Sequence, residues 1–185
     1  MQNLLPEKTE YILSDLLFFF HDRLKIHLKE EGARYDALEA VLSKDSDDFL
    51  LVARHVESLI AFINTHDGMN FVASVKRTAN ILENEFQKNT TIANEINPEL
   101  FVEQEEQQLY HAICDVEKKI LAPINATNLS FALDILAPLG KLIDLFFEQV
   151  LVNDKNPDIR ANRLALLKRI HTMTQAVADF SKLVL

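Results

Sequence analysis

The sequence is poor in the residues on which several kinds of enzyme site depend. Its 185 residues include 3 glycines, 5 prolines and 1 cysteine. With so few glycines the chain can hardly build a phosphate-binding loop, and it contains no GxxxxGK[ST], GxGxxG, HExxH, CxxC or GxSxG motif. We therefore expect no catalytic residue, metal or cofactor in this chain. The lone Cys114 excludes an internal disulfide and fits a reducing compartment, so we expect a cytoplasmic protein.

Long hydrophobic runs are also missing. The apolar cluster "LLFFF" (16–20) is far shorter than the roughly 18 residues of a membrane span, and "HDRLK" follows it closely. The start, "MQNLLPEKTEY", lacks the basic region and the small-residue cleavage site of a signal peptide. We therefore expect neither a membrane anchor nor a membrane partner.

Helical periodicity runs through nearly the whole sequence, and no segment alternates like a strand. The pattern predicts an all-α fold, a compact bundle of about seven helices in a single domain over 1–185. We expect the last helix to begin at Pro157, capped by Asn156, and to run to the C-terminus. The sixth should bend or break near Ala137–Gly140. The predicted helices cover about 7–30, 35–43, 46–64, 69–88, 103–121, 128–151 and 157–185.

Charge is unevenly distributed along the chain. The net charge of −9 argues against general adhesion to nucleic acid, DNA included. Residues 91–120 hold seven acids against two lysines, whereas residues 155–185 hold six Lys and Arg against two acids. An acidic protein thus concentrates its positive charge in its last predicted helix, around "DIRANRLALLKRIHT" (158–172).

On a helical wheel, the last helix divides into a core stripe and a charged side. Arg160 and Lys168 lie opposite the stripe, so we expect them to be solvated. Arg163 and Arg169 flank it and should lay their aliphatic stems on neighbouring apolar surface. The stripe consists of Ile159, Leu166, Ile170, Met173, Val177, Phe180 and Val184.

The predicted helix at 69–88 divides in the same way. One face groups Lys76, Arg77, Asn80 and Asn84, a compact set of cationic and amide donors. A solvated face explains such a group in most helices, so spacing alone does not establish a binding site. The core face consists of Phe71, Val72, Val75, Ala79, Leu82 and Phe86.

Two alternative functions remain open at this point. The dipeptides His21-Asp22 and His66-Asp67 are typical of metal-dependent HD phosphohydrolases, which would also need a further His and a distant Asp. His55 and Asp144 are the candidates, although a helix surface and a turn explain the dipeptides more simply. The second alternative is a helical protein-interaction module that docks through the acidic segment 91–120.

Five blocks of the sequence carry a resemblance to a known family. The "KRTANIL" and "IRANRLALL" portions are the most specific. Together the blocks resemble, in order and over nearly the whole chain, the C-terminal region of the beta subunit of bacterial heterotetrameric glycyl-tRNA synthetase. The blocks are "FFFHDRLKIHLKEEGARYDALEAVL" (18–42), "VARHVESLIAF" (52–62), "FVASVKRTANIL" (71–82), "FFEQVLVNDKNPDIRANRLALLKRI" (146–170) and "VADFSKL" (177–183).

This resemblance implies an all-helical anticodon-binding domain related to the DALR domain of arginyl-tRNA synthetase. The chain would be a non-catalytic C-terminal fragment of a longer beta subunit. The whole enzyme uses ATP and Mg²⁺ to form glycyl-adenylate and then transfers glycine to the tRNA 3′ end. The implied partners are the tRNA for glycine, the alpha subunit and the rest of the beta subunit, in a heterotetramer of two alpha and two beta subunits.

The resemblance also turns the basic helices into candidate tRNA-binding elements. A globally acidic domain suppresses adhesion to arbitrary RNA, while a local basic face attracts tRNA phosphates. We expect the cations of both helices to share one tRNA-facing surface. The candidate tRNA-binding residues are Lys76, Arg77, Asn80, Arg160, Arg163 and Lys168.

Overall fold

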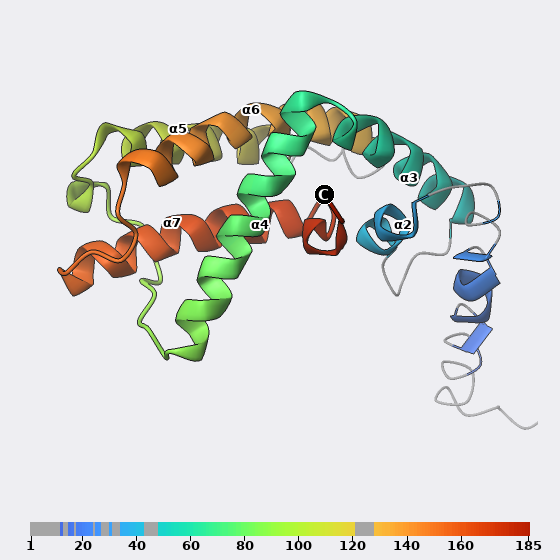
Figure 1. The fold of residues 1–185 in the computed structure, drawn as a ribbon, viewed down its shortest axis with the longest axis horizontal. Coiled ribbons are helices and arrows are strands. Elements are labelled where there is room, and N and C mark those ends of the chain that lie inside the picture. Colours follow the sequence, from blue (N-terminus) through green and yellow to red (C-terminus); the bar gives the residue numbers. More distant parts are fainter. Residues whose placement is uncertain are drawn as a thin grey trace, which may run out of the picture.

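The computed structural model describes residues 34–42, 48–120 and 128–185, together with 12, 15–16, 18–23, 25–26 and 30. Every regular element in these ranges is helical, so the all-α prediction is confirmed for the described residues (Figure 1). The described residues between 12 and 30 are helical as well. The elements are α2 (Tyr35–Val41), α3 (Phe49–Ile63), α4 (His66–Gln87), the 3-10 helix η1 (Pro98–Leu100), α5 (Gln104–Ile120), α6 (Leu129–Gln149), α7 (Pro157–Gln175) and the 3-10 helix η2 (Phe180–Lys182).

Helix α4 crosses the molecule steeply and packs against α6, α7, α3 and η2 (Figure 1). Helix α5 packs on α6 and α7, and α2 packs on α3 and η2. An aromatic contact lies within the core: the rings of Phe71 in α4 and Phe180 in η2 meet edge to face, with centroids 5.3 Å apart. Both side chains are buried, so the C-terminal segment is part of the core.

Helices α4 and α6 approach closely at Gly140. A Cβ atom there would lie 2.8 Å from the Cα atom of Phe71, so only glycine fits. Beside this contact, the Ser74 hydroxyl donates to Asp144 Oδ1 at 2.5 Å. Of the bend or break predicted near Ala137–Gly140, the break is wrong, because α6 continues through Pro138. Proline removes one helical hydrogen bond, but Pro138 is exposed, so water can satisfy the carbonyl that loses its partner.

Helix α7 is buried on nearly all sides over Asn162–Leu167, where the wheel predicted one stripe. It ends at Gln175 and not at the C-terminus, and the chain turns back through η2 to α2 and α4. The prediction of Val184 as a core residue is therefore wrong: its side chain is 68% exposed. Phe86, predicted on the core face of α4, is also exposed, whereas its neighbour Glu85 is buried.

No helix among the described residues is long and apolar enough to cross a membrane.

Candidate functional site

The donor face of α4 follows from how the helix begins and what it buries. Thr65 caps the helix, with its hydroxyl oxygen accepting from the backbone N–H of Gly68 at 3.0 Å. His66 and Asp67 therefore belong to the first turn of α4 and not to a preceding turn. Because the face with Phe71 and Val75 packs in the core, the helical period directs Lys76, Arg77, Asn80 and Asn84 away from its centre.

This face forms one wall of an open groove of about 540 Å³. The other wall is the end of the chain, Val184 and Leu185, whose aliphatic side chains are 68% and 60% exposed. The groove thus combines amide and cationic donors with an exposed apolar surface. Its lining residues are Ala73, Lys76, Arg77, Asn80, Ile81, Asn84, Val184 and Leu185.

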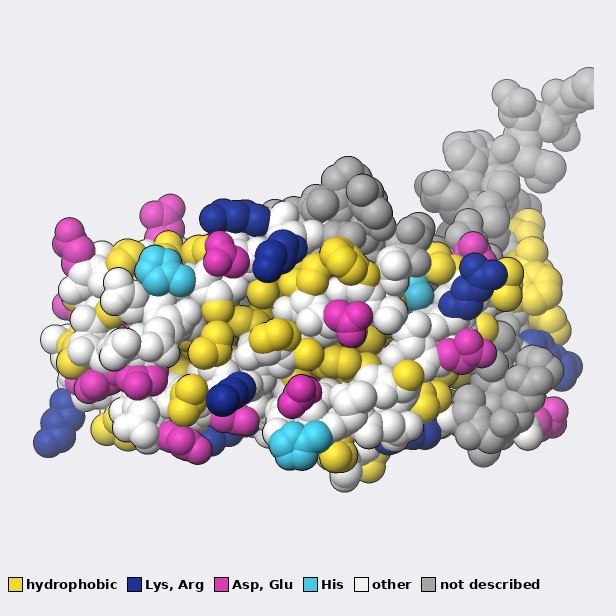
Figure 2. Space-filling view, turned by 90° about the horizontal axis from the view of Figure 1, so that it is seen from above, with side chains coloured by type: hydrophobic (Ala, Val, Ile, Leu, Met, Phe, Trp, Pro, Cys, Tyr) yellow, Lys and Arg dark blue, Asp and Glu magenta, His cyan; other side chains and the backbone are white. Residues whose placement is uncertain are grey.

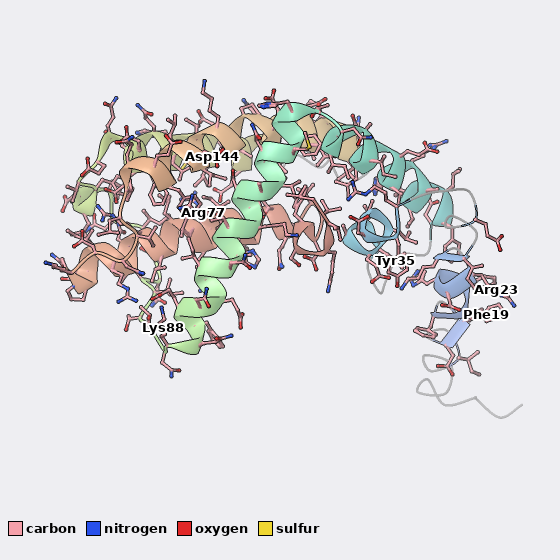
Figure 3. The ribbon with its side chains drawn as sticks, viewed as in Figure 1. Phe19, Arg23, Tyr35, Arg77, Lys88 and Asp144 are labelled. Atoms are coloured by element: carbon pink, nitrogen blue, oxygen red, sulfur yellow. The ribbon has the colours of Figure 1, made fainter. Side chains whose placement is uncertain are left out.

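Arg77 projects from the middle of α4 (Figure 3). Its guanidinium carbon lies 4.2 Å from the centroid of the Phe147 ring in α6, a cation–π contact that holds the planar group in place. Arg77 is exposed and forms no ion pair with any described residue. Its N–H donors are therefore available to an anionic or planar ligand.

Lys76 is half-buried and already has a partner within the chain. Its Nζ atom donates to the backbone carbonyl of Leu183 at 2.5 Å, which ties the C-terminal segment to α4. Its charge still contributes to the potential in the groove, but the ammonium group itself serves the fold. Asn80, one turn further along α4, is exposed in the groove.

Arg160, at the start of α7, is not a solvated residue as predicted. It pairs with the carboxylate of Glu85 at the end of α4, and Glu85 is only 2% exposed. Glu85 also accepts from Lys88 at 2.9 Å and from the Thr90 hydroxyl at 2.8 Å. These hydrogen bonds, that from Lys88 above all, outweigh burial and lower the pKa of Glu85 to about 2. Arg160 thus neutralises the buried carboxylate of Glu85. Lys88, which also binds Glu85, lies at the same end of α4 (Figure 3).

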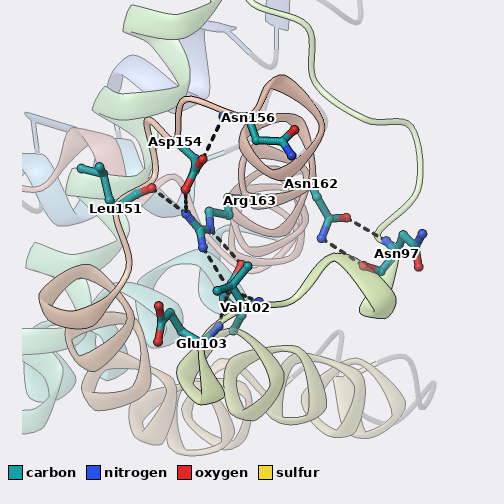
Figure 4. Close-up of polar contacts among 9 residues, drawn as sticks. Asn97, Val102, Glu103, Leu151, Asp154, Asn156, Asn162 and Arg163 are labelled. Carbon is teal, nitrogen blue, oxygen red and sulfur yellow. Dashed lines mark hydrogen bonds and ion pairs between the residues drawn. The ribbon is translucent and has the colours of Figure 1, made fainter.

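Arg163 is 3% exposed, at the centre of a buried polar network (Figure 4). Its guanidinium donates to both carboxylate oxygens of Glu106 in α5, at 2.9 and 3.2 Å. It also donates to the carbonyl of Leu151 at 2.9 Å and to Asp154 at 3.0 Å. This network excludes Arg163 from the RNA-accessible surface, and the residue is structural in this fold.

Glu106 shows why the network needs an arginine. Burial alone would raise its pKa, but hydrogen bonds from Arg163 and from the backbone N–H groups of Glu103 and Val102 outweigh burial and lower that pKa. Nearby, the Asn162 side chain binds the backbone N–H and carbonyl of Asn97, at 2.8 and 3.1 Å (Figure 4). The segment 88–97, which follows α4, is thereby held against α7.

The remaining cations of α7 lie around a second groove, lined among others by Glu95, Tyr110, Lys168 and Arg169. Arg169 donates to Glu117 in α5 at 2.8 and 2.5 Å, and this contact raises the pKa of Arg169. Lys168 is exposed and forms no ion pair with any described residue. This second groove borders the acidic segment 91–120, which is less favourable for RNA than the groove at α4.

The six predicted residues therefore do not share one free surface. Lys76, Arg77 and Asn80 lie together, Lys168 lines another groove, and Arg160 and Arg163 pair with buried acids. The sequence did not indicate that Val184 and Leu185 line the groove at α4. No periodicity could have found them, since the chain returns to α4 only through long-range contacts.

The face at the top of Figure 1, shown in Figure 2, mixes acidic, basic and hydrophobic side chains. No continuous basic patch appears among the described side chains on that face. The phosphohydrolase alternative gains no support either: the described residues contain no group of three or more His, Cys, Asp or Glu that could hold a metal ion. The candidate ligand Asp144 is bound by Ser74, and His66 and Asp67 are both exposed.

A comparison with family models matches residues 72–178 to the DALR anticodon-binding domain. The match begins early in α4, ends just beyond α7, and covers more than half of the chain. The chain belongs to the DALR anticodon-binding domain family. Domains of this family serve aminoacyl-tRNA synthetases in recognising the anticodon of tRNA. The match contains the α4 side of the groove, but neither α2 nor residues 183–185.

Proposed function

We propose that this chain is the anticodon-binding domain of the beta subunit of a glycyl-tRNA synthetase. The groove at α4 carries the proposal, because Arg77, Asn80 and Asn84 present donors beside the apolar surface of Val184 and Leu185. Single-stranded RNA is recognised by stacking of its bases on aromatic rings or Arg planes and by donors that reach the base edges and the phosphates. Arg77 offers both a plane and donors, and the aliphatic side chains of Val184 and Leu185 add apolar surface beside it. The family match supports tRNA recognition, and the sequence blocks quoted above support glycine as the amino acid.

In this proposal the chain binds and does not catalyse. It works in the cytoplasm as part of a heterotetramer of two alpha and two beta subunits, and the whole enzyme uses ATP and Mg²⁺ to attach glycine to its tRNA. The surface that faces tRNA contains Arg77, Asn80 and Asn84. Lys76 contributes charge, Lys168 contributes at most at the margin, and Arg160 and Arg163 contribute through the fold.

Binding of the full chain to three RNAs tests the proposal. The RNAs are a glycine tRNA transcript, the same transcript with its anticodon bases replaced, and a duplex RNA of equal charge. We expect tightest binding to the first, with each directly read base contributing about 1–3 kcal/mol by analogy with DNA base readout. Equal affinity for the tRNA and the duplex would contradict anticodon recognition. Glycine-dependent exchange between ATP and pyrophosphate by this chain alone would contradict the non-catalytic role.

A further inference from the structure

The segment that closes the groove is held from two sides. From α4, Lys76 donates to the carbonyl of Leu183 at 2.5 Å. From the α2 side, Asp36 Oδ2 accepts from the backbone N–H of Val184 at 2.6 Å, and Arg34 donates to the Val184 carbonyl. The Leu183 side chain is buried between these contacts. Residues 183–185 thus have a defined position beside α4, although they follow the last helical element (Figure 1).

Arg34 and Asp36 form a paired clamp. Arg34 Nε donates to Asp36 Oδ1 at 3.0 Å, and its Nη2 atom contacts Oδ2 at 2.5 Å. The Arg34 contact, with the Val184 N–H, lowers the pKa of Asp36 to about 2, so the carboxylate stays ionised at neutral pH. The clamp leaves the side chains of Val184 and Leu185 pointing into the groove beside Arg77 and Asn80.

We propose that Arg34 and Asp36 are positioning residues for RNA binding, which hold residues 183–185 as the wall on which an unstacked base packs. Arg77 and Asn80 then reach the edge of that base or its phosphate from the opposite wall. The inference rests on the proposed tRNA-binding function. Both the clamp and the segment it holds lie outside residues 72–178, so the groove depends on parts of the chain beyond the family match.

Charge alone and positioning predict opposite outcomes for Asp36→Asn. Removing a negative charge near an RNA groove strengthens phosphate binding if only electrostatics acts. If Asp36 instead positions residues 183–185, the substitution loosens that segment, and the loss of preorganisation weakens RNA binding. We expect Asp36→Asn to weaken binding of the full chain to a glycine tRNA transcript by about tenfold, the size of one charge-assisted hydrogen bond.

Val184→Pro provides a second variant that leaves α2 intact. It removes the N–H that Asp36 binds, and Leu183, at φ −66° and ψ 138°, already has the backbone conformation that a residue before proline prefers. We expect a similar weakening, and a less than additive loss in the double variant, because both changes break the contact between Asp36 and the Val184 N–H. Glu39→Gln is the matched control, since Glu39 lies on the same helix but pairs with Lys25. Its affinity should equal that of the wild type.

The binding measurements distinguish a failure of the positioning role of Arg34 and Asp36 from a failure of the proposed tRNA binding. If the wild type prefers the tRNA over a duplex and Arg77→Ala weakens binding, the proposed function stands. Unchanged or tighter binding by Asp36→Asn and Val184→Pro would then overturn the clamp alone. If the wild type shows no preference for the tRNA, the proposed function fails and the inference with it. Affinities are compared per folded molecule, with the folded fraction taken from circular dichroism.

Discussion

Helices α4 and α7 both carry cations on the faces that the sequence marks as basic, but the fold uses them differently. On α4, Arg77 rests on an aromatic ring and keeps its donors free. On α7, Arg160, Arg163 and Arg169 each pair with an acid from another segment: Glu85, Glu106 and Glu117. The positive charge of a segment is therefore a poor measure of the charge it offers to a ligand.

The acidic segment 91–120 is the counterpart of α7. Two of its seven acids, Glu106 and Glu117, bind arginines of α7. The opposite charges of these two segments thus partly cancel inside the protein. This pairing reduces the charge available for a protein-docking face on 91–120.

The largest effect should come from Arg163→Met. The change leaves Glu106 buried with two backbone donors but without its arginine, and breaking a buried pair costs about 3–5 kcal/mol. Denaturant unfolding should show this loss, and RNA affinity per folded molecule should be unchanged. The double variant with Glu106→Gln should recover part of the loss. A stable Arg163→Met protein with weakened RNA binding would place Arg163 on the interface after all.

The contacts of Glu85 with Lys88, Thr90 and Arg160 should make the free energy of unfolding depend on pH in the acid range. The folded-state pKa of Glu85 is about 2, below its ordinary value of 4.5, so its contribution is present above pH 4.5 and lost as pH falls toward 2. The full contribution is about 3 kcal/mol as an upper figure. The difference in unfolding free energy between wild type and Glu85→Gln should shrink across this window. Glu83→Gln, an exposed change on the same helix, is the matched control.

Arg160→Ala removes one partner of Glu85 and tests whether this cation of α7 serves the fold. It leaves the buried Glu85 with Lys88 and Thr90, so we expect a loss of about 1–3 kcal/mol in stability. A thermal melt measures this loss, and RNA binding should fall only as far as the folded fraction does. An unchanged melting temperature with reduced affinity would instead assign Arg160 to the RNA surface.

Arg77→Ala should show the reverse pattern. We expect stability to fall by only about 0.5–1 kcal/mol, the cation–π contribution. If Arg77 contacts a phosphate, the slope of log affinity against log salt should decrease by about 0.7–0.9. Arg77→Lys keeps the charge but not the planar donors, so it should retain the slope while losing base discrimination. An unchanged slope and affinity in Arg77→Ala would remove the groove from the proposed function.

Lys168→Ala should have the smallest effect. The side chain is exposed beside Glu95 in the second groove, so stability should change by less than about 0.5 kcal/mol. The same salt titration should show a smaller change than for Arg77→Ala. A change as large as that for Arg77 would extend the RNA surface across both grooves.

Much of the fold was predictable because helix signals are local. The start of α7 agrees with its prediction: the Asn156 side chain accepts from the N–H of Asp158 at 2.9 Å, and Pro157 follows as the first helical residue. The continuous α6 was not predictable, because the tolerance of Pro138 depends on its exposure. The site was only partly predictable: the α4 donors were identified as a group, whereas their apolar partner at the chain end was not.

Period, caps and breakers act within a few residues of one another, so the local sequence sets the helices and the donor face of α4. Which cations remain free depends instead on the acid that each helix meets in the folded protein. Glu85 lies 75 residues from Arg160 and Glu106 lies 57 from Arg163, separations at which no local pattern constrains pairing. The groove at α4 could not be predicted for the same reason. Its second wall, residues 183–185, reaches α4 only after the chain has passed through the core and returned to Arg34 and Asp36.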